Sequence, residues 1–256
     1  KIIKKFPIEA NIMPNFEIAD DSLSRRLIEE AKDKLFEKFD DETVECIKTI
    51  TLYKNDEDLL SMLNSLLGKK EKLIYLKDKF FSIEEIEREL KSIFNIENSL
   101  EDLKKNFYSD ETNKKDILHL FDILEENKKT EDLCILKEYW NSNKKEELFN
   151  TYSGFFLTQS GTVKKKGTGI TKDIVSVFPE IQDIFILEGE RLINFIDSLN
   201  SLKIIKLTTK LLQLAYKILD IYTSLKRENG VLDYGDLIIY TNKLLSESSS
   251  ADWVAY

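Results

Sequence analysis

The chain is dominated by one long helical stretch, which begins at Pro179, runs to about Glu228 and reads PEIQDIFILEGERLINFIDSLNSLKIIKLTTKLLQLAYKILDIYTSLKRE. Its apolar residues recur every three or four positions, the spacing of one face of an α-helix. They are Leu187, Leu192, Phe195, Ile196, Leu199, Leu202, Ile205, Leu211, Leu212, Ala215, Leu219 and Tyr222. We expect two helices of roughly 20 to 25 residues here, joined at Asn200-Ser201, with Asn229-Gly230 ending the second.

Shorter amphipathic helices are predicted on both sides of this stretch. Asp20, Asp21 and Ser22 can cap a helix whose apolar residues follow at four-residue spacing. Those residues are Leu23, Leu27, Ala31, Leu35 and Phe39. Asp56 is expected to cap the next helix, and Ser82 with Glu85 has the pattern of a capping box. Further helices are predicted at about 99–107, 114–126 and 130–152, and a last one from Asp233 through Leu245.

The composition favours the same fold class. The 256 residues include only 8 Gly and 3 Pro, whereas average usage would supply roughly 31 such residues. Most turns of a β-rich fold are therefore missing, and we expect an all-α, multi-helix domain with its long helices in the C-terminal part. One small hairpin or extended arm is expected near 155–168. Within a single domain over 1–256, the expected parts are 1–152 with short helices, 153–178 as a basic loop or arm, and 179–256.

Charge and apolar patterning exclude several classes. The net charge of −9 argues against a surface that is basic all over. The sequence contains no run of about 18 apolar residues and no secretory leader, so we expect a cytoplasmic protein without a membrane partner. Cys46 and Cys134 are expected to be buried small hydrophobic residues, and His119, the only histidine, to lie at the surface or at its boundary with the core.

No pattern of residues indicates catalysis within this chain. The segment nearest to a phosphate-binding loop, Gly161 to Gly167, has the wrong spacing and carries Thr168 where the lysine should be. Pairs of carboxylates are plentiful, but such pairs arise by chance and at helix ends in a chain that is one-third charged. We therefore expect no catalytic residue and no metal site.

Lysines offer the clearest functional pattern. Between Gly161 and Lys172 there are four lysines and no acidic residue. Such a segment can track a phosphate backbone and release its counterions. A second set is spaced by three and four residues, as on one helix face. The predicted DNA-binding residues are Lys164, Lys165, Lys166 and Lys172, with Lys203, Lys206 and Lys210 on the long helical stretch.

Three stretches of the sequence are similar to motifs of a known family. They are Phe6-Pro7-Ile8-Glu9-Ala10 with Met13 to Asp20; Phe156-Leu157-Thr158 with the lysines and Phe178-Pro179-Glu180; and Leu232-Asp233-Tyr234-Gly235-Asp236-Leu237-Ile238 with Trp253-Val254-Ala255-Tyr256. Together they resemble the AddA family, the UvrD/RecB-like superfamily 1 helicase–nuclease subunits of the AddAB complex for double-strand-break repair. The third resembles the family motif L-D-[FY]-D-D-L-[IL], from which Gly235 departs. The middle of the chain, about 40–150, carries no such motif.

The resemblance implies that the chain is the helical accessory subdomain called 1B, inserted into the first motor domain of an ATP-dependent DNA helicase and exonuclease. Its expected partners are duplex DNA with a single-stranded tail and a subunit of AddB type. ATP and Mg²⁺ would bind the parent chain outside this stretch, which would hold no cofactor and be inactive alone. The motif residues would be structural, with the two acids capping a helix and docking on the motor. They are Phe6, Pro7, Asp233, Tyr234, Asp236 and Leu237.

Other interpretations remain open. Lys1 is not an initiator Met, and the chain stops at Tyr256 after an apolar run, so we expect an excised piece of a longer protein. The alternative function is an all-α protein–protein interaction module that binds a partner subunit, which the net acidic charge and the short helices of 40–150 suit. A free-standing enzyme is a third reading, which ATPase activity of the purified chain would support.

Overall fold

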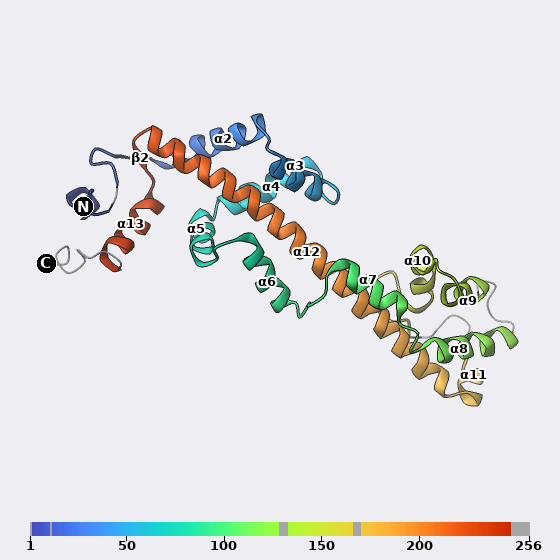
Figure 1. The fold of residues 1–256 in the computed structure, drawn as a ribbon. Coiled ribbons are helices and arrows are strands. Elements are labelled where there is room, and N and C mark those ends of the chain that lie inside the picture. Colours follow the sequence, from blue (N-terminus) through green and yellow to red (C-terminus); the bar gives the residue numbers. More distant parts are fainter. Residues whose placement is uncertain (1, 11, 128–132, 166–169, 247–256) are drawn as a thin grey trace. The chain divides into compact units, whose positions relative to one another are not determined.

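The computed structural model describes residues 2–10, 12–127, 133–165 and 170–246, and these residues form thirteen α-helices and one two-stranded sheet (Figure 1). The expected all-α class is confirmed. The chain divides into two compact units, unit 1 (Lys1–Glu89 and Lys206–Tyr256) and unit 2 (Leu90–Ile205). The chain passes from one unit to the other after Glu89 and after Ile205, whereas the expected parts end at 152 and 178.

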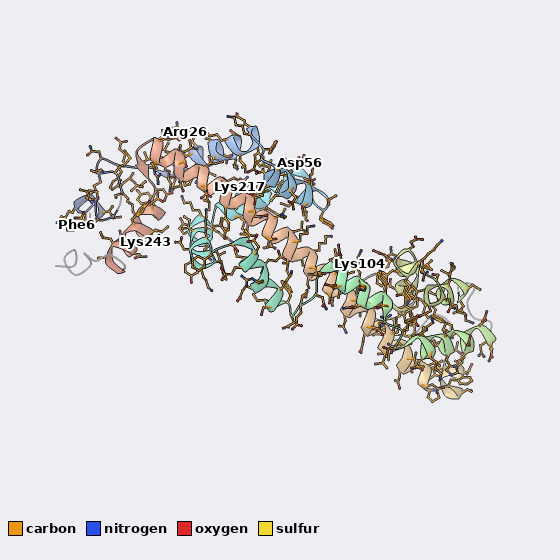
Figure 2. The ribbon with its side chains drawn as sticks, in the orientation of Figure 1. Phe6, Arg26, Asp56, Lys104, Lys217 and Lys243 are labelled. Atoms are coloured by element: carbon orange, nitrogen blue, oxygen red, sulfur yellow. The ribbon has the colours of Figure 1, made fainter. Side chains whose placement is uncertain are left out.

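Unit 1 is built around the C-terminal part of the longest helix, α12 (Glu180–Glu228). Its other helices are α1 (Ile2–Lys5), α2 (Asp21–Glu37), α3 (Asp41–Thr51), α4 (Asp56–Leu67), α5 (Lys70–Lys79), the first part of α6 (Ile83–Ile93), and α13 (Tyr234–Ser246). Strands β1 (Glu17–Ile18) and β2 (Val231–Leu232) pair in parallel. Lys217, labelled in Figure 2, bonds Asp40 at the start of α3 with its ammonium group 2.7 Å from Oδ2. Ion pairs of this kind tie the short helices to α12.

Helix caps in unit 1 follow the predicted chemistry with one shift. The Asp20 carboxylate accepts a hydrogen bond from the backbone N–H of Leu23 at 2.7 Å, as expected for α2. The cap of α4, however, is Asn55, whose side chain accepts from the N–H of Asp58 at 2.7 Å. The prediction of Asp56 was wrong by one residue because both neighbouring types can cap, and the backbone turn selects between them.

Helix α12 continues through the predicted joint without a break. The joint at Asn200-Ser201 was wrong, since neither residue costs more than about 0.7 kcal/mol in a helix interior and no proline occurs between 180 and 228. The predicted end is confirmed, because α12 stops at Glu228 and Gly230 takes a positive φ of 64°. That conformation favours glycine, and it turns the chain into β2.

Unit 2 contains more helices than the sequence predicts. They are the rest of α6, α7 (Leu100–Ser109), α8 (Lys114–Glu126), α9 (Leu133–Asn141), α10 (Lys145–Phe156) and α11 (Lys172–Val177), with the N-terminal part of α12. The single helix predicted at 130–152 is thus wrong: α9 and α10 are separated at Ser142, whose hydroxyl accepts from the N–H of Lys144 at 3.2 Å. A serine that bonds the nearby backbone competes with helical hydrogen bonding.

The two cysteines and the histidine differ in exposure. Cys46 is buried as expected, but Cys134 is exposed, so its predicted burial was wrong. Leu133 and Leu136 turn inward from α9, and Cys134 takes the opposite face. His119 is exposed, in agreement with the prediction.

A short hairpin-like turn follows α10 and confirms the expectation of a small hairpin. Leu157 and Val163 form an antiparallel bridge, and Gly161 at the turn has a φ of 78°. Val163 then packs against Gly189 of α12 so closely that a Cβ added to the glycine would lie 2.8 Å from both Val163 methyl groups. A glycine within α12 is therefore required for this contact.

Replacing Gly189 by alanine is expected to destabilise unit 2 by about 1–3 kcal/mol, because the methyl group would force the hairpin off α12. Chemical denaturation followed by circular dichroism would measure the change. Gly154→Ala is the matched control, since Gly154 is also helical but has no atom within 4 Å of the added Cβ. It should be neutral or stabilise by up to about 1 kcal/mol, and equal effects of the two substitutions would contradict the packing argument.

Candidate nucleic-acid interface

Three of the predicted lysines come together in unit 2. Lys164 and Lys165 follow the hairpin bridge at Val163, and Lys172 begins α11. All three line one pocket of about 350 Å³. Lys166 lies outside the described residues.

The hairpin fixes the direction of Lys164. Its backbone N–H donates to the carbonyl of Phe156 at 2.9 Å, and its ammonium group donates to the carbonyl of Gly154 at 2.6 Å. Lys164 is therefore half-buried and held to the end of α10, whereas Lys165 and Lys172 are exposed.

The rest of the pocket is apolar with a few neutral polar groups. No carboxylate is among the described residues that line it: Lys164, Lys165, Ile170, Thr171, Lys172, Val175, Ser176, Gln182, Phe185 and Ile186. Positive charge at the rim is thus not neutralised by an acid within the pocket. Such a hollow can bind an anionic ligand that also carries an apolar part.

The predicted lysines of α12 do not join this group. Lys203 belongs to unit 2, while Lys206 and Lys210 belong to unit 1. The Lys210 ammonium group lies 2.8 Å from a carboxylate oxygen of Glu45. Burial acts to lower the pKa of Lys210, but the bond to Glu45 outweighs it and raises that pKa. Lys210 thus binds α3, and Lys203 and Lys206 are exposed.

The acidic motif of the third familiar stretch forms a buried charge cluster in unit 1. Asp233 is 3% exposed, and its Oδ2 accepts from Tyr222 at 2.6 Å, Lys70 at 2.9 Å and Lys226 at 3.2 Å. Burial alone would raise the pKa of Asp233. The charge of Lys226 and the bonds from Tyr222 and Lys70 outweigh burial and hold the pKa well below its usual range.

Asp236 completes a reciprocal cap at the start of α13. Its backbone N–H donates to Oδ1 of Asp233 at 2.9 Å, and its Oδ2 accepts from the N–H of Asp233 at 2.9 Å. Its carboxylate also accepts from Lys226, with the ammonium group 2.6 Å from Oδ1. The expected capping role of the two acids therefore agrees with the geometry.

The remaining motif residues lie around α13. Leu237 packs against the buried cluster of Ile3, Ala10 and Phe16, whereas Tyr234 is 61% exposed. Phe6, labelled in Figure 2, and Pro7 shape the segment after α1 through their carbonyls, which accept from Ala10 and Ile12. The stretch Trp253-Val254-Ala255-Tyr256 lies outside the described residues.

Sequence reasoning missed a buried polar network in unit 2. Glu188 is fully buried and accepts from the Tyr152 hydroxyl at 2.9 Å and from Arg191 at 2.7 and 2.8 Å. Tyr152 in turn accepts from the indole N–H of Trp140 at 3.0 Å. The sequence does contain an indication of this network. Glu188 is an acidic residue on an apolar stripe of α12, with Phe185 three residues before it and Leu192 four residues after it.

The described residues form neither a metal-binding cluster of acids, cysteines and histidine nor a membrane-spanning helix. No three His, Cys, Asp or Glu side chains in 2–10, 12–127, 133–165 and 170–246 gather closely enough to hold a metal ion. Among the helices of those same ranges, none combines the length and the apolar character needed to cross a bilayer.

The fold and these contacts define an all-α protein with a lysine-rimmed pocket in one unit and a buried charge cluster in the other. No protein-family model matches the chain, and no curated protein sequence matches it.

Proposed function

We propose that this chain is a helical accessory subdomain of an ATP-dependent DNA helicase and nuclease of the AddA type, acting in the cytoplasm in double-strand-break repair. The observation that carries the proposal is the grouping of Lys164, Lys165 and Lys172 around one pocket whose described lining residues include no acid. In this role the lysines bind phosphates of duplex DNA with a single-stranded tail. The chain contributes guidance of DNA, and the parent protein supplies ATP hydrolysis with Mg²⁺ and pairs with a subunit of AddB type.

The test is salt-dependent DNA binding by the chain. Reversing the two exposed lysines, in Lys165→Glu/Lys172→Glu, is expected to reduce the slope of log Kd against log salt by about two, since each phosphate contact contributes about one. Fluorescence anisotropy with a tailed duplex between low and moderate salt would measure this slope.

The matched control reverses two other lysines of unit 2. Lys105 on α7 and Lys115 on α8 are exposed, and neither lines the pocket. Lys105→Glu/Lys115→Glu changes the net charge equally and should leave the slope nearly unchanged. Equal losses in both double variants would mean that binding follows net charge rather than this site.

A second candidate function is a protein–protein interaction module. It is supported by an exposed apolar stripe on α13, in which Tyr234 is 61%, Ile238 62% and Leu245 43% exposed. Spacings of four and seven residues put these side chains on one helix face. In this function the stripe docks on the motor or on the partner subunit.

Charge placed on that stripe should disrupt such docking. We expect Ile238→Glu to weaken binding to an AddB-type subunit by at least about tenfold, as for a central apolar contact. Titration calorimetry would measure it. Ile204→Glu, at a residue of α12 that is 51% exposed, should bind normally. Unchanged affinity of the Ile238 variant would remove the stripe from the proposal.

A further inference from the structure

The lysine-rimmed pocket of unit 2 has two chemically distinct parts. Its floor is apolar and includes Phe185, which is 2% exposed, with Ile170, Val175 and Ile186. Its rim carries the three lysines. Phosphate contacts alone would need only the rim, so the floor requires a separate explanation.

One wall of the floor is held in place before any ligand arrives. The Phe185 ring lies 5.0 Å from the ring of Phe156 and 5.9 Å from that of Phe155, measured between centroids. All three rings belong to the buried core of unit 2, whereas Ile186 is 38% exposed. Phe185 therefore loses little conformational entropy on binding, which favours affinity.

The size and polar groups of the pocket narrow the ligand class. Its volume of about 350 Å³ falls within the range of about 300–1,000 Å³ typical of small-ligand pockets. Thr171, Ser176 and Gln182 add hydroxyl and amide groups to the lining. An apolar, flat group with hydrogen-bonding edges and attached phosphates matches this lining, and a nucleotide has that composition.

We infer that the pocket receives one unpaired base of the single-stranded tail while the lysines hold its flanking phosphates. This inference rests on the proposed DNA-binding function and adds that the site reads the presence of a base. A paired base inside a continuous duplex cannot enter without leaving its stack. The pocket therefore distinguishes a tailed end from an uninterrupted duplex.

The experiment compares three DNA ligands on the complete 256-residue chain by fluorescence anisotropy at one low salt concentration. They are a duplex with a thymidine tail, the same duplex with an abasic tail of equal length and charge, and the same duplex closed at both ends by abasic loops. We expect the thymidine tail to bind about tenfold more tightly than the abasic tail, the scale of one base stacked or packed on protein.

Two substitutions connect this ratio to the pocket. Ile186→Asp places a carboxylate in the apolar floor and should reduce the ratio of the two affinities to about one. Leu187→Asp is the matched control, since Leu187 is adjacent and 61% exposed but does not line the pocket; it should keep the full ratio. If Ile186→Asp does not fold, Ile186→Ser is the second variant.

The possible outcomes test the base pocket and the DNA-binding function separately. Binding of tailed DNA with equal affinity for thymidine and abasic tails would overturn the base pocket and leave the DNA-binding function standing. A ratio that persists in Ile186→Asp and Ile186→Ser would place base recognition elsewhere and overturn the assignment. Absence of binding to all three ligands at low salt would overturn both the inference and the proposed function.

Discussion

Replacing Glu188 by alanine is expected to destabilise unit 2 by about 3–5 kcal/mol, because it leaves Arg191 without its main counter-ion in a buried position. Arg191 donates twice to Glu188, and its side chain is 16% exposed. Its guanidinium also lies 4.2 Å from the centre of the Phe107 ring. The hydroxyl of Tyr152 loses an acceptor in the same substitution.

Trp140 provides a local readout of this effect. It bonds Tyr152 within the network, and the chain contains only 2 Trp. In a Trp253→Phe background, fluorescence during chemical denaturation would follow unit 2 alone. The exposed neighbour Glu190 supplies the control, since Glu190→Ala should stay within about 0.5 kcal/mol of the parent.

A double variant tests whether the loss arises from the unpaired charge. Glu188→Leu/Arg191→Leu removes both charges and fills the space with apolar atoms, so we expect it to be less destabilised than Glu188→Ala. If the double variant were destabilised as much as Glu188→Ala, the unpaired charge of Arg191 would not be the cause.

The second large effect is expected at Asp233. Asp233→Ala should destabilise unit 1 by about 3–5 kcal/mol, because Tyr222 loses its acceptor and Lys226, which is 5% exposed, loses one of its two carboxylate partners among the described residues. The Asp236 N–H loses its cap in the same change. Denaturation followed by circular dichroism would report the loss as a lower transition midpoint.

Asp220 is the control for that substitution. It also lies on α12 within unit 1 and pairs with Lys77, but its side chain is 67% exposed. Exposed pairs of this kind contribute about 0–1 kcal/mol, so Asp220→Ala should have a small effect. A comparable loss in both variants would show that burial does not decide the outcome.

The depressed pKa of Asp233 also predicts a pH dependence. A carboxyl group whose pKa is lower in the folded state stabilises fully above its unfolded pKa of about 3.9 and loses this contribution as the pH falls toward the native pKa. Stability measured from pH 6 down to about pH 2 should therefore fall more steeply in the parent than in Asp233→Asn. Parallel curves for the two proteins would contradict the assigned shift.

Local chemistry could be predicted where neighbouring residues decide it. Asp20 caps α2 and Gly230 follows the end of α12, because side-chain hydrogen bonding and glycine conformation act within a few residues. The grouping of Lys164, Lys165 and Lys172 could be predicted only in part. Their proximity in sequence suggested one segment, but the pocket floor from α11 and α12 depends on how the chain folds back.

The error at the predicted helix joint arose because the local signals there were balanced. Asn200 and Ser201 only weakly disfavour the interior of a helix and do not by themselves end one, and α12 continues through them. Lys210 has the spacing of an exposed helix face, yet Glu45 of α3 holds it at 2.8 Å. Spacing along one helix predicts which face of the helix a residue lies on. It does not predict which other element of the chain packs against that face.

By itself, the sequence determined the helical class of this protein, the caps at Asp20 and Asp233 and the run of lysines, because glycine and proline scarcity, apolar periodicity and cap residues act over a few positions. The tertiary structure alone decided which charges are buried. Glu188 with Arg191, and Asp233 with Lys70 and Lys226, are charged residues like many others in the chain until packing removes them from water. Burial depends on residues brought together from distant segments, such as α5 with the start of α13, and that juxtaposition exists only in the folded chain.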